Sequence, residues 1–158
     1  MSPEDQAAVN EYISEFFDAA RYGELEDLQV MFGHERLRQL IDFPSLIDES
    51  TGSSPLMLAA ANGHSECVEF LSNTVSVPVN YKNKNGNTAL HWAALNGHSD
   101  VVSFLISKSA DVMAENFFKK TPFDEAMARD HKECCELLVK EEVRLLGPAD
   151  EDEDGDRV

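Results

Sequence analysis

The sequence predicts an all-α fold: a solenoid of about four stacked helix-turn-helix repeats with short β-turn fingers and a disordered acidic C-terminal tail. The first observation is a repeat, because segments 52–71 and 86–105 align with each other without a gap. A third segment, 119–138, aligns with both. The second observation is that each segment carries the same apolar helical stripe. One unit cannot bury its stripe alone, so neighbouring units must stack.

The N-terminal repeat, at about 5–32, is degenerate and has no finger motif. It is recognised by Ala19 and Gly23, which correspond to Ala59 and Gly63 of the next repeat. An insertion at 33–49 follows. Together these features predict a capping repeat with a longer loop or an extra turn.

The three regular repeats are expected at about 49–82, 83–115 and 116–146, and with the first repeat they form one domain over 1–147. Paired alanines in the short first helices allow close packing, and a glycine follows the first two of these helices, where a left-handed residue is favoured. The longer second helices carry the apolar stripe that faces the core.

One finger departs from the pattern, because Lys119 stands where the two preceding repeats have Gly52 and Gly86. A left-handed backbone costs a lysine roughly 1 kcal/mol. We therefore expect the last finger to be bent differently. Residues 72–78 replace the usual tight turn between the second and third repeats.

Short motifs recur at fixed places in these units. Residues 88–91 read Thr-Ala-Leu-His, 54–57 and 121–124 are degraded copies, and Gly-His occurs at 63–64 and again at 97–98. This pattern resembles the ankyrin repeat over about residues 12–140. The resemblance implies that fingers and short helices line a concave face, and that partners bind there.

The repeat register predicts an apolar strip along that face, formed by Tyr22, Trp92, Leu95, Phe117 and Phe118. Exposed aromatic residues are typical binding anchors. The alternative is that the phenylalanine pair merely covers the neighbouring finger. Finger tips rarely have enough neighbours to bury two rings, which favours binding. The predicted partner-binding residues are Tyr22, Asn62, Lys84, Asn85, Trp92, Leu95, Asn96, Phe117, Phe118 and Arg129.

The chain is strongly acidic, with 30 acidic and 13 basic residues and a formal net charge of −17. This balance argues against binding a nucleic-acid backbone or an anionic membrane and favours a basic partner. Residues 1–50 carry a net charge of −9. The tail, 148–158, is expected to be disordered and to act electrostatically. Its acidic residues are Asp150, Glu151, Asp152, Glu153, Asp154 and Asp156.

No catalytic residue, cofactor or metal is predicted. His131, Cys134 and Cys135 raise the alternative of a metal site, but the two cysteines occupy stripe positions and no Cys-x-x-Cys motif accompanies them. The histidines that follow each turn, and His91, are expected to bind turn backbone. No apolar run approaches the ~18 residues of a membrane span. Three cysteines do not form a disulfide framework. We expect a reduced intracellular compartment.

The degenerate first repeat, the four-repeat size and the acidic tail are similar to those of the small yeast ankyrin-repeat chaperone of ribosomal protein S-three. The resemblance implies a non-catalytic chaperone of the cytoplasm and nucleus. Its client would be newly made S-three, a basic protein of the small ribosomal subunit, held soluble until assembly. We expect a monomer when free. An adaptor or inhibitor of a kinase, phosphatase or transcription factor is the alternative; an enzyme is poorly supported, because such a groove rarely supplies a convergent polar pocket.

Overall fold

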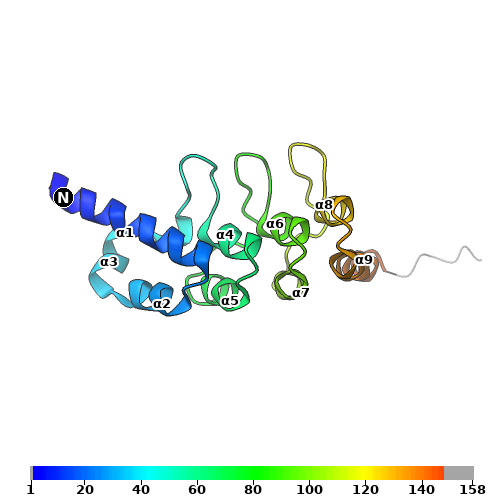
Figure 1. The fold of residues 1–158 in the computed structure, drawn as a ribbon, viewed down its shortest axis with the longest axis horizontal. Helices are drawn as coiled ribbons and strands as arrows, with labels where there is room; N and C mark the ends of the chain where they lie inside the picture. The colour runs from blue at the N-terminus through cyan, green and yellow to red at the C-terminus, as the bar shows by residue number, and fades with distance from the viewer. Residues whose placement is uncertain (1, 148–158) are drawn as a thin grey trace, which may run out of the picture.

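The computed structural model describes residues 2–147, and the predicted tail with its six acidic residues lies outside this range. Every regular element within the range is a helix, which confirms the predicted all-α solenoid. The helices stack in a row, with the fingers projecting from one side (Figure 1). They are α1 (Pro3–Tyr22), α2 (Leu25–Gly33), α3 (Glu35–Leu40), the 3-10 helix η1 (Phe43–Ser45), α4 (Pro55–Ala61), α5 (Ser65–Asn73), α6 (Ala89–Leu95), α7 (Ser99–Ser107), α8 (Pro122–Ala128) and α9 (Lys132–Leu146). None of the described helices is long and apolar enough to cross a membrane.

The inner helices α4, α6 and α8 have seven residues each and begin at a capped residue. Ser54, Thr88 and Thr121 each accept a hydrogen bond from the backbone N–H three residues ahead, which pairs a donor that the helix leaves free. His91 Nδ1 lies 2.9 Å from the Thr88 hydroxyl, and its Nε2 donates to the Lys120 carbonyl at 2.9 Å. His91 therefore joins its own helix to the next finger, the backbone role predicted for it.

The core lies between the inner helices and the outer helices α5, α7 and α9. Small alanines bring the inner helices together, and the stripe of each outer helix fills the space behind them. Removing a large side chain from such a core costs about 2–5 kcal/mol. The fully buried residues of the two central repeats include Ala59, Ala60, Val68, Leu71, Ala93, Ala94, Val102 and Leu105.

The N-terminal repeat has its own aromatic core. Its insertion folds into α3 and η1, and η1 places Phe43, which is 1% exposed, against Phe16. The ring centroids of Phe16 and Phe43 are 4.9 Å apart, and those of Phe32 and Phe43 are 5.5 Å apart, both in edge-to-face geometry. The Tyr12 hydroxyl donates to the Met31 carbonyl at 2.9 Å and ties α1 to α2.

Consecutive repeats are joined by a histidine that docks against a glycine, which confirms the structural role predicted for the turn histidines. Nε2 of each ring donates to a carbonyl of the preceding repeat: His64 to Arg21 at 2.9 Å, His98 to Ala61 at 3.0 Å and His131 to Leu95 at 3.0 Å. A Cβ on the facing glycine would lie 2.5 Å from the ring Nδ1, and these glycines are Gly23, Gly63 and Gly97, all with positive φ. Asp130 takes the equivalent position in the last repeat, with a φ of 58°.

The last finger keeps the shape of the preceding one, so the expected different bend is wrong. Lys119 adopts the left-handed conformation with a φ of 61°, as Gly86 does with a φ of 75°. Its N–H donates to the Asn116 carbonyl at 3.0 Å, and the Gly86 N–H donates to the Asn83 carbonyl at 2.9 Å. The hydrogen bonds of the turn outweigh the local preference of the lysine.

Candidate functional site

The fingers and inner helices form a concave face with a hollow between its first two fingers. The hollow has a volume of about 330 Å³. Its apolar lining comes from the inner helices, with Met57 and Leu58 on α4 and Trp92 on α6, while Thr51 and Asn85 of the fingers supply polar lining. A hollow with an apolar lining and polar finger groups suits a protein segment with one apolar side.

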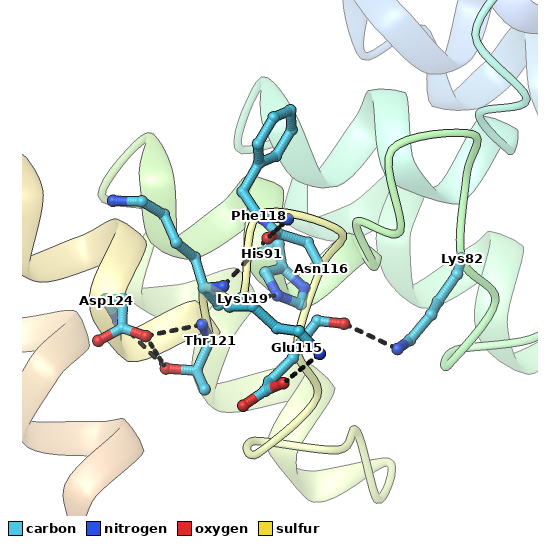
Figure 2. A network of polar contacts seen from close by, with 9 residues as sticks. Lys82, His91, Glu115, Asn116, Phe118, Lys119, Thr121 and Asp124 are labelled. Carbon is cyan, nitrogen blue, oxygen red and sulfur yellow. Dashed lines mark hydrogen bonds and ion pairs between the residues drawn. The ribbon is translucent and has the colours of Figure 1, made fainter.

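A buried asparagine at the base holds each of the last two fingers in shape. The Asn83 side-chain oxygen accepts the backbone N–H groups two and four residues ahead, both at 3.0 Å. Asn116 does the same for Phe118 at 2.9 Å and Lys120 at 3.1 Å (Figure 2). The Asn116 amide nitrogen also donates to the Asn87 side chain at 2.9 Å, which links the two fingers. The finger tips are therefore positioned before any partner arrives.

The two phenylalanines of the last finger combine exposure with contact. Each side chain is 70% exposed. The Phe117 ring nevertheless lies against Gly86 of the preceding finger, and the Phe117 N–H donates to the Asn85 carbonyl at 3.0 Å. Phe118 points away from the polar network beneath it (Figure 2). Phe117 thus touches the neighbouring finger, as the alternative expected, yet both rings present most of their surface to solvent.

The other three apolar residues of the predicted strip lie on inner helices. Tyr22, at the end of α1, is 65% exposed, while Trp92 and Leu95 on α6 are half-buried. The indole Nε1 of Trp92 is buried without a hydrogen-bond partner among residues 2–147. Trp92 therefore offers ring surface to a partner, not a hydrogen bond.

Three of the five polar residues predicted to bind the partner have structural side-chain contacts of their own. Asn62 donates to the carbonyl four residues back at 2.9 Å, and Asn96 donates to the Ala61 carbonyl of the preceding helix at 2.8 Å. The Lys84 ammonium bonds carbonyls of the preceding finger. Arg129 is exposed and forms no ion pair within residues 2–147. Asn85 is also exposed and uses only its backbone in the finger, so Asn85 and Arg129 are the two polar members whose side chains are free of such contacts among residues 2–147.

Two charged residues outside the predicted partner-binding set also line the hollow. Arg21 lines the hollow and pairs with Asp18 at 2.7 Å. Asp48 lines it too, and hydrogen bonds from Ser50 and Thr51 lower the pKa of its carboxyl to about 2. Arg21 shares the repeat register of Ala61, an α4 residue that lines the hollow, and this register places it on the concave face. Asp48 lies in the insertion, where no repeat register points to it.

The first repeat concentrates acidic side chains on its surface. A hollow of about 310 Å³ is bordered by Glu15 and Asp18 of α1, by Glu24, which precedes α2, and by Asp27 of α2. Val30, which is 73% exposed, lines the same hollow. Negative potential is therefore strong at this end of the solenoid, where it would attract a basic protein.

Burial shifts the pKa of the Cys134 and Cys135 thiols and of the His91 ring. Cys67 and Cys134 are buried as stripe residues, and burial raises the pKa of Cys134 to about 11, so the thiol stays protonated and unreactive. Burial also raises the pKa of Cys135 and lowers that of His91. Residues 2–147 contain no group of three or more His, Cys, Asp or Glu side chains that could hold a metal ion.

The sequence matches the model of a known protein family over most of its length. The model of ankyrin repeats in three copies matches residues 16–116 and 79–147. The chain belongs to the ankyrin-repeat family. The fingers, inner helices and outer helices described above are therefore the standard parts of an ankyrin stack.

One solved structure is similar over nearly the whole chain. It is the crystal structure of the yeast ribosomal protein Rps3 in complex with its chaperone Yar1. The sequences are 33% identical, the TM-score is 0.73, and the alignment covers 89% of this chain and 94% of that chain. No curated protein matches this chain significantly. The similarity therefore reaches beyond the three regular repeats.

Proposed function

We propose that this ankyrin protein is a non-catalytic chaperone for ribosomal protein S3 of the small subunit, and that it keeps the newly made client soluble until assembly. The observation that carries the proposal is the likeness to the chaperone Yar1 over 89% of this chain and 94% of that one, at 33% identity. An ankyrin adaptor with an unrelated partner would share the repeat but would not need to match over so much of the chain.

The charge of the chain supports a basic client. A free ribosomal protein exposes a face of lysine and arginine that binds RNA in the assembled subunit, and a chain with a net charge of −17 is suited to cover such a face. Opposite charge on the two surfaces accelerates encounter. The acidic surface of the first repeat thus attracts the client and competes with stray nucleic acid.

The concave face supplies the specific contacts. An amphipathic helix of the client would place its apolar side along Trp92, Leu95 and the exposed rings of Phe117 and Phe118. The preformed fingers reduce the entropy lost on binding, because their tips need no ordering. The chaperone acts in the cytoplasm, where the client is made, and in the nucleus, where subunits assemble.

The test is a titration of the full chain with purified ribosomal protein S3, repeated from low salt to several hundred millimolar. A second basic protein of the small subunit is the control. We expect S3 to bind, the control to bind far more weakly, and S3 affinity to fall as salt rises, because exposed charges are screened beyond ~10 Å at 0.1 M. Light scattering should also show that the chain prevents S3 aggregation. Equal binding of both proteins, or an S3 affinity that is flat with salt, would contradict the proposal.

The second candidate is an adaptor or inhibitor for a kinase, phosphatase or transcription factor. It is favoured by the central part of the chain, because residues 51–100 hold only three acidic and two basic residues. A central segment with so little charge does not itself require a basic partner. Co-purification followed by mass spectrometry distinguishes the two candidate functions, since an adaptor would co-purify with a partner other than S3.

A further inference from the structure

Glu125 is an acidic residue at a position where the sister repeats are apolar. In the repeat register it is equivalent to Leu58 and Trp92, which line the hollow of the concave face. Glu125 lies on α8 and is half-buried. The fold accepts a leucine or a tryptophan at this position, so packing does not require a charge there.

A chain of side-chain amides fixes the Glu125 carboxylate. The Asn116 amide nitrogen donates to Glu125 Oε1 at 3.1 Å and to the Asn87 side chain at 2.9 Å. Asn116 is 3% exposed and also shapes the last finger, so it cannot turn away. The carboxylate is thus held in one orientation beside the finger that carries Phe117 and Phe118.

No cation within residues 2–147 neutralises this carboxylate, because no lysine or arginine of that range forms an ion pair with Glu125. Partial burial of a carboxylate weakens its hydration, and one neutral hydrogen bond offsets only part of that cost. A half-buried charge without a counter-charge is available for a cation from outside, and its field is less screened than that of a fully exposed acid.

Apolar side chains stand beside the carboxylate. Trp92, Leu95 and Glu125 border one small space between α6 and α8. Lysine and arginine combine an aliphatic stem with a charged end, and they pack the stem on apolar surface while the end reaches a polar group. The face of an indole also attracts cations. A rigid carboxylate next to a tryptophan and a leucine matches this side-chain chemistry.

We propose that Glu125 binds the cationic end of one lysine or arginine of the client, whose aliphatic stem lies on Trp92 and Leu95. The proposal rests on the proposed function, since it names the contact that a basic client makes on the concave face. It gives that face a specificity-determining charge of its own, separate from the diffuse acidity of the first repeat. A client without a basic residue at this place would bind the apolar strip and leave Glu125 unpaired.

The test compares Glu125→Gln with Glu66→Gln in titrations against ribosomal protein S3. Both variants lose one negative charge, and Glu66 is exposed on the outer helix α5, away from the concave face. Glutamine at 125 keeps an acceptor for Asn116, so the finger keeps its shape. We expect Glu125→Gln to weaken binding about tenfold and to flatten the dependence on salt, because it removes a charge-assisted contact. Glu66→Gln should change affinity less than twofold.

Wild-type binding in the same series separates the two proposals. If the wild type does not bind S3, the proposed function is wrong. If the wild type binds and Glu125→Gln binds within twofold of it, or if Glu66→Gln weakens binding equally, the Glu125 site is wrong while the function stands. Glu125→Leu places the residue of the second repeat at this position. It removes the carboxylate without introducing the side-chain amide of glutamine, so it tests the same contact in a second way. It should weaken S3 binding at least as much as glutamine does, and unchanged binding would overturn the site.

Discussion

The first and fourth repeats use phenylalanine in opposite ways. In the first, Phe16 and Phe43 are at most 1% exposed and pack edge to face, inside a region whose surface is strongly acidic. In the fourth, Phe117 and Phe118 are each 70% exposed on a finger held by buried amides. The difference shows that the first repeat buries its aromatic rings in a core beneath an acidic surface, while the fourth repeat exposes its rings as contact surface.

The largest effect on stability is expected in the first repeat. Phe43→Ala should lower the free energy of unfolding by about 3–5 kcal/mol, because it leaves a cavity between Phe16 and Phe32. Urea unfolding followed by circular dichroism measures the loss. A loss below about 1 kcal/mol, well under the usual cost of such a cavity, would show that the insertion is not part of the cooperative core.

The matching change in the fourth repeat should affect binding instead. Replacing Phe117 and Phe118 by Ser should cost about 2 kcal/mol or more of client binding, as truncation of a central aromatic anchor commonly does. The melting temperature should fall little, since both rings are mostly exposed. Affinity and melting temperature are measured on the same variant. Unchanged affinity would place the site on the acidic first repeat, and a large loss of stability would show that the rings belong to the core.

The left-handed lysine offers a smaller and opposite effect. Lys119→Gly should raise the free energy of unfolding by about 1 kcal/mol, because glycine adopts the positive φ without steric cost. The variant also loses the exposed pair with Glu115 at 3.5 Å, which contributes little. Lys119→Ala loses that pair but keeps the strain, so it is the control and should unfold like the wild type. Equal stability of all three proteins would mean that the finger relaxes in the native state.

The smallest effect on stability is expected from the tail. Deleting 149–158 removes six acidic residues and no residue of the described core. The melting temperature should stay within experimental error, while the association rate with a basic client should fall at low salt. Stopped-flow mixing at two salt concentrations measures the rate. A melting temperature several degrees lower would show that the tail docks on the fold.

Features that repeat were predictable, and features that depend on one contact were not. The binding of the turn histidines to turn backbone was predicted from Gly-His at 63–64 and its copy at 97–98. The packing of each ring against the glycine of the preceding repeat was not predicted. The shape of the last finger was predicted wrongly, since the hydrogen bonds around Asn116 outweigh a local preference of roughly 1 kcal/mol. The role we propose for Glu125 was not predicted, because it depends on the hydrogen bond with Asn116, a pairing that exists only in the fold.

The histidine–glycine joint also determines where the array can grow. Each joint needs a residue without a Cβ, because that atom would lie 2.5 Å from the incoming ring. The last repeat has Asp130 at this place, with the same positive φ but with a side chain. A fifth repeat of the same design would bring its histidine ring against that side chain, and one of the two would have to move. Asp130→Gly is therefore the first substitution to make when the solenoid is lengthened by design.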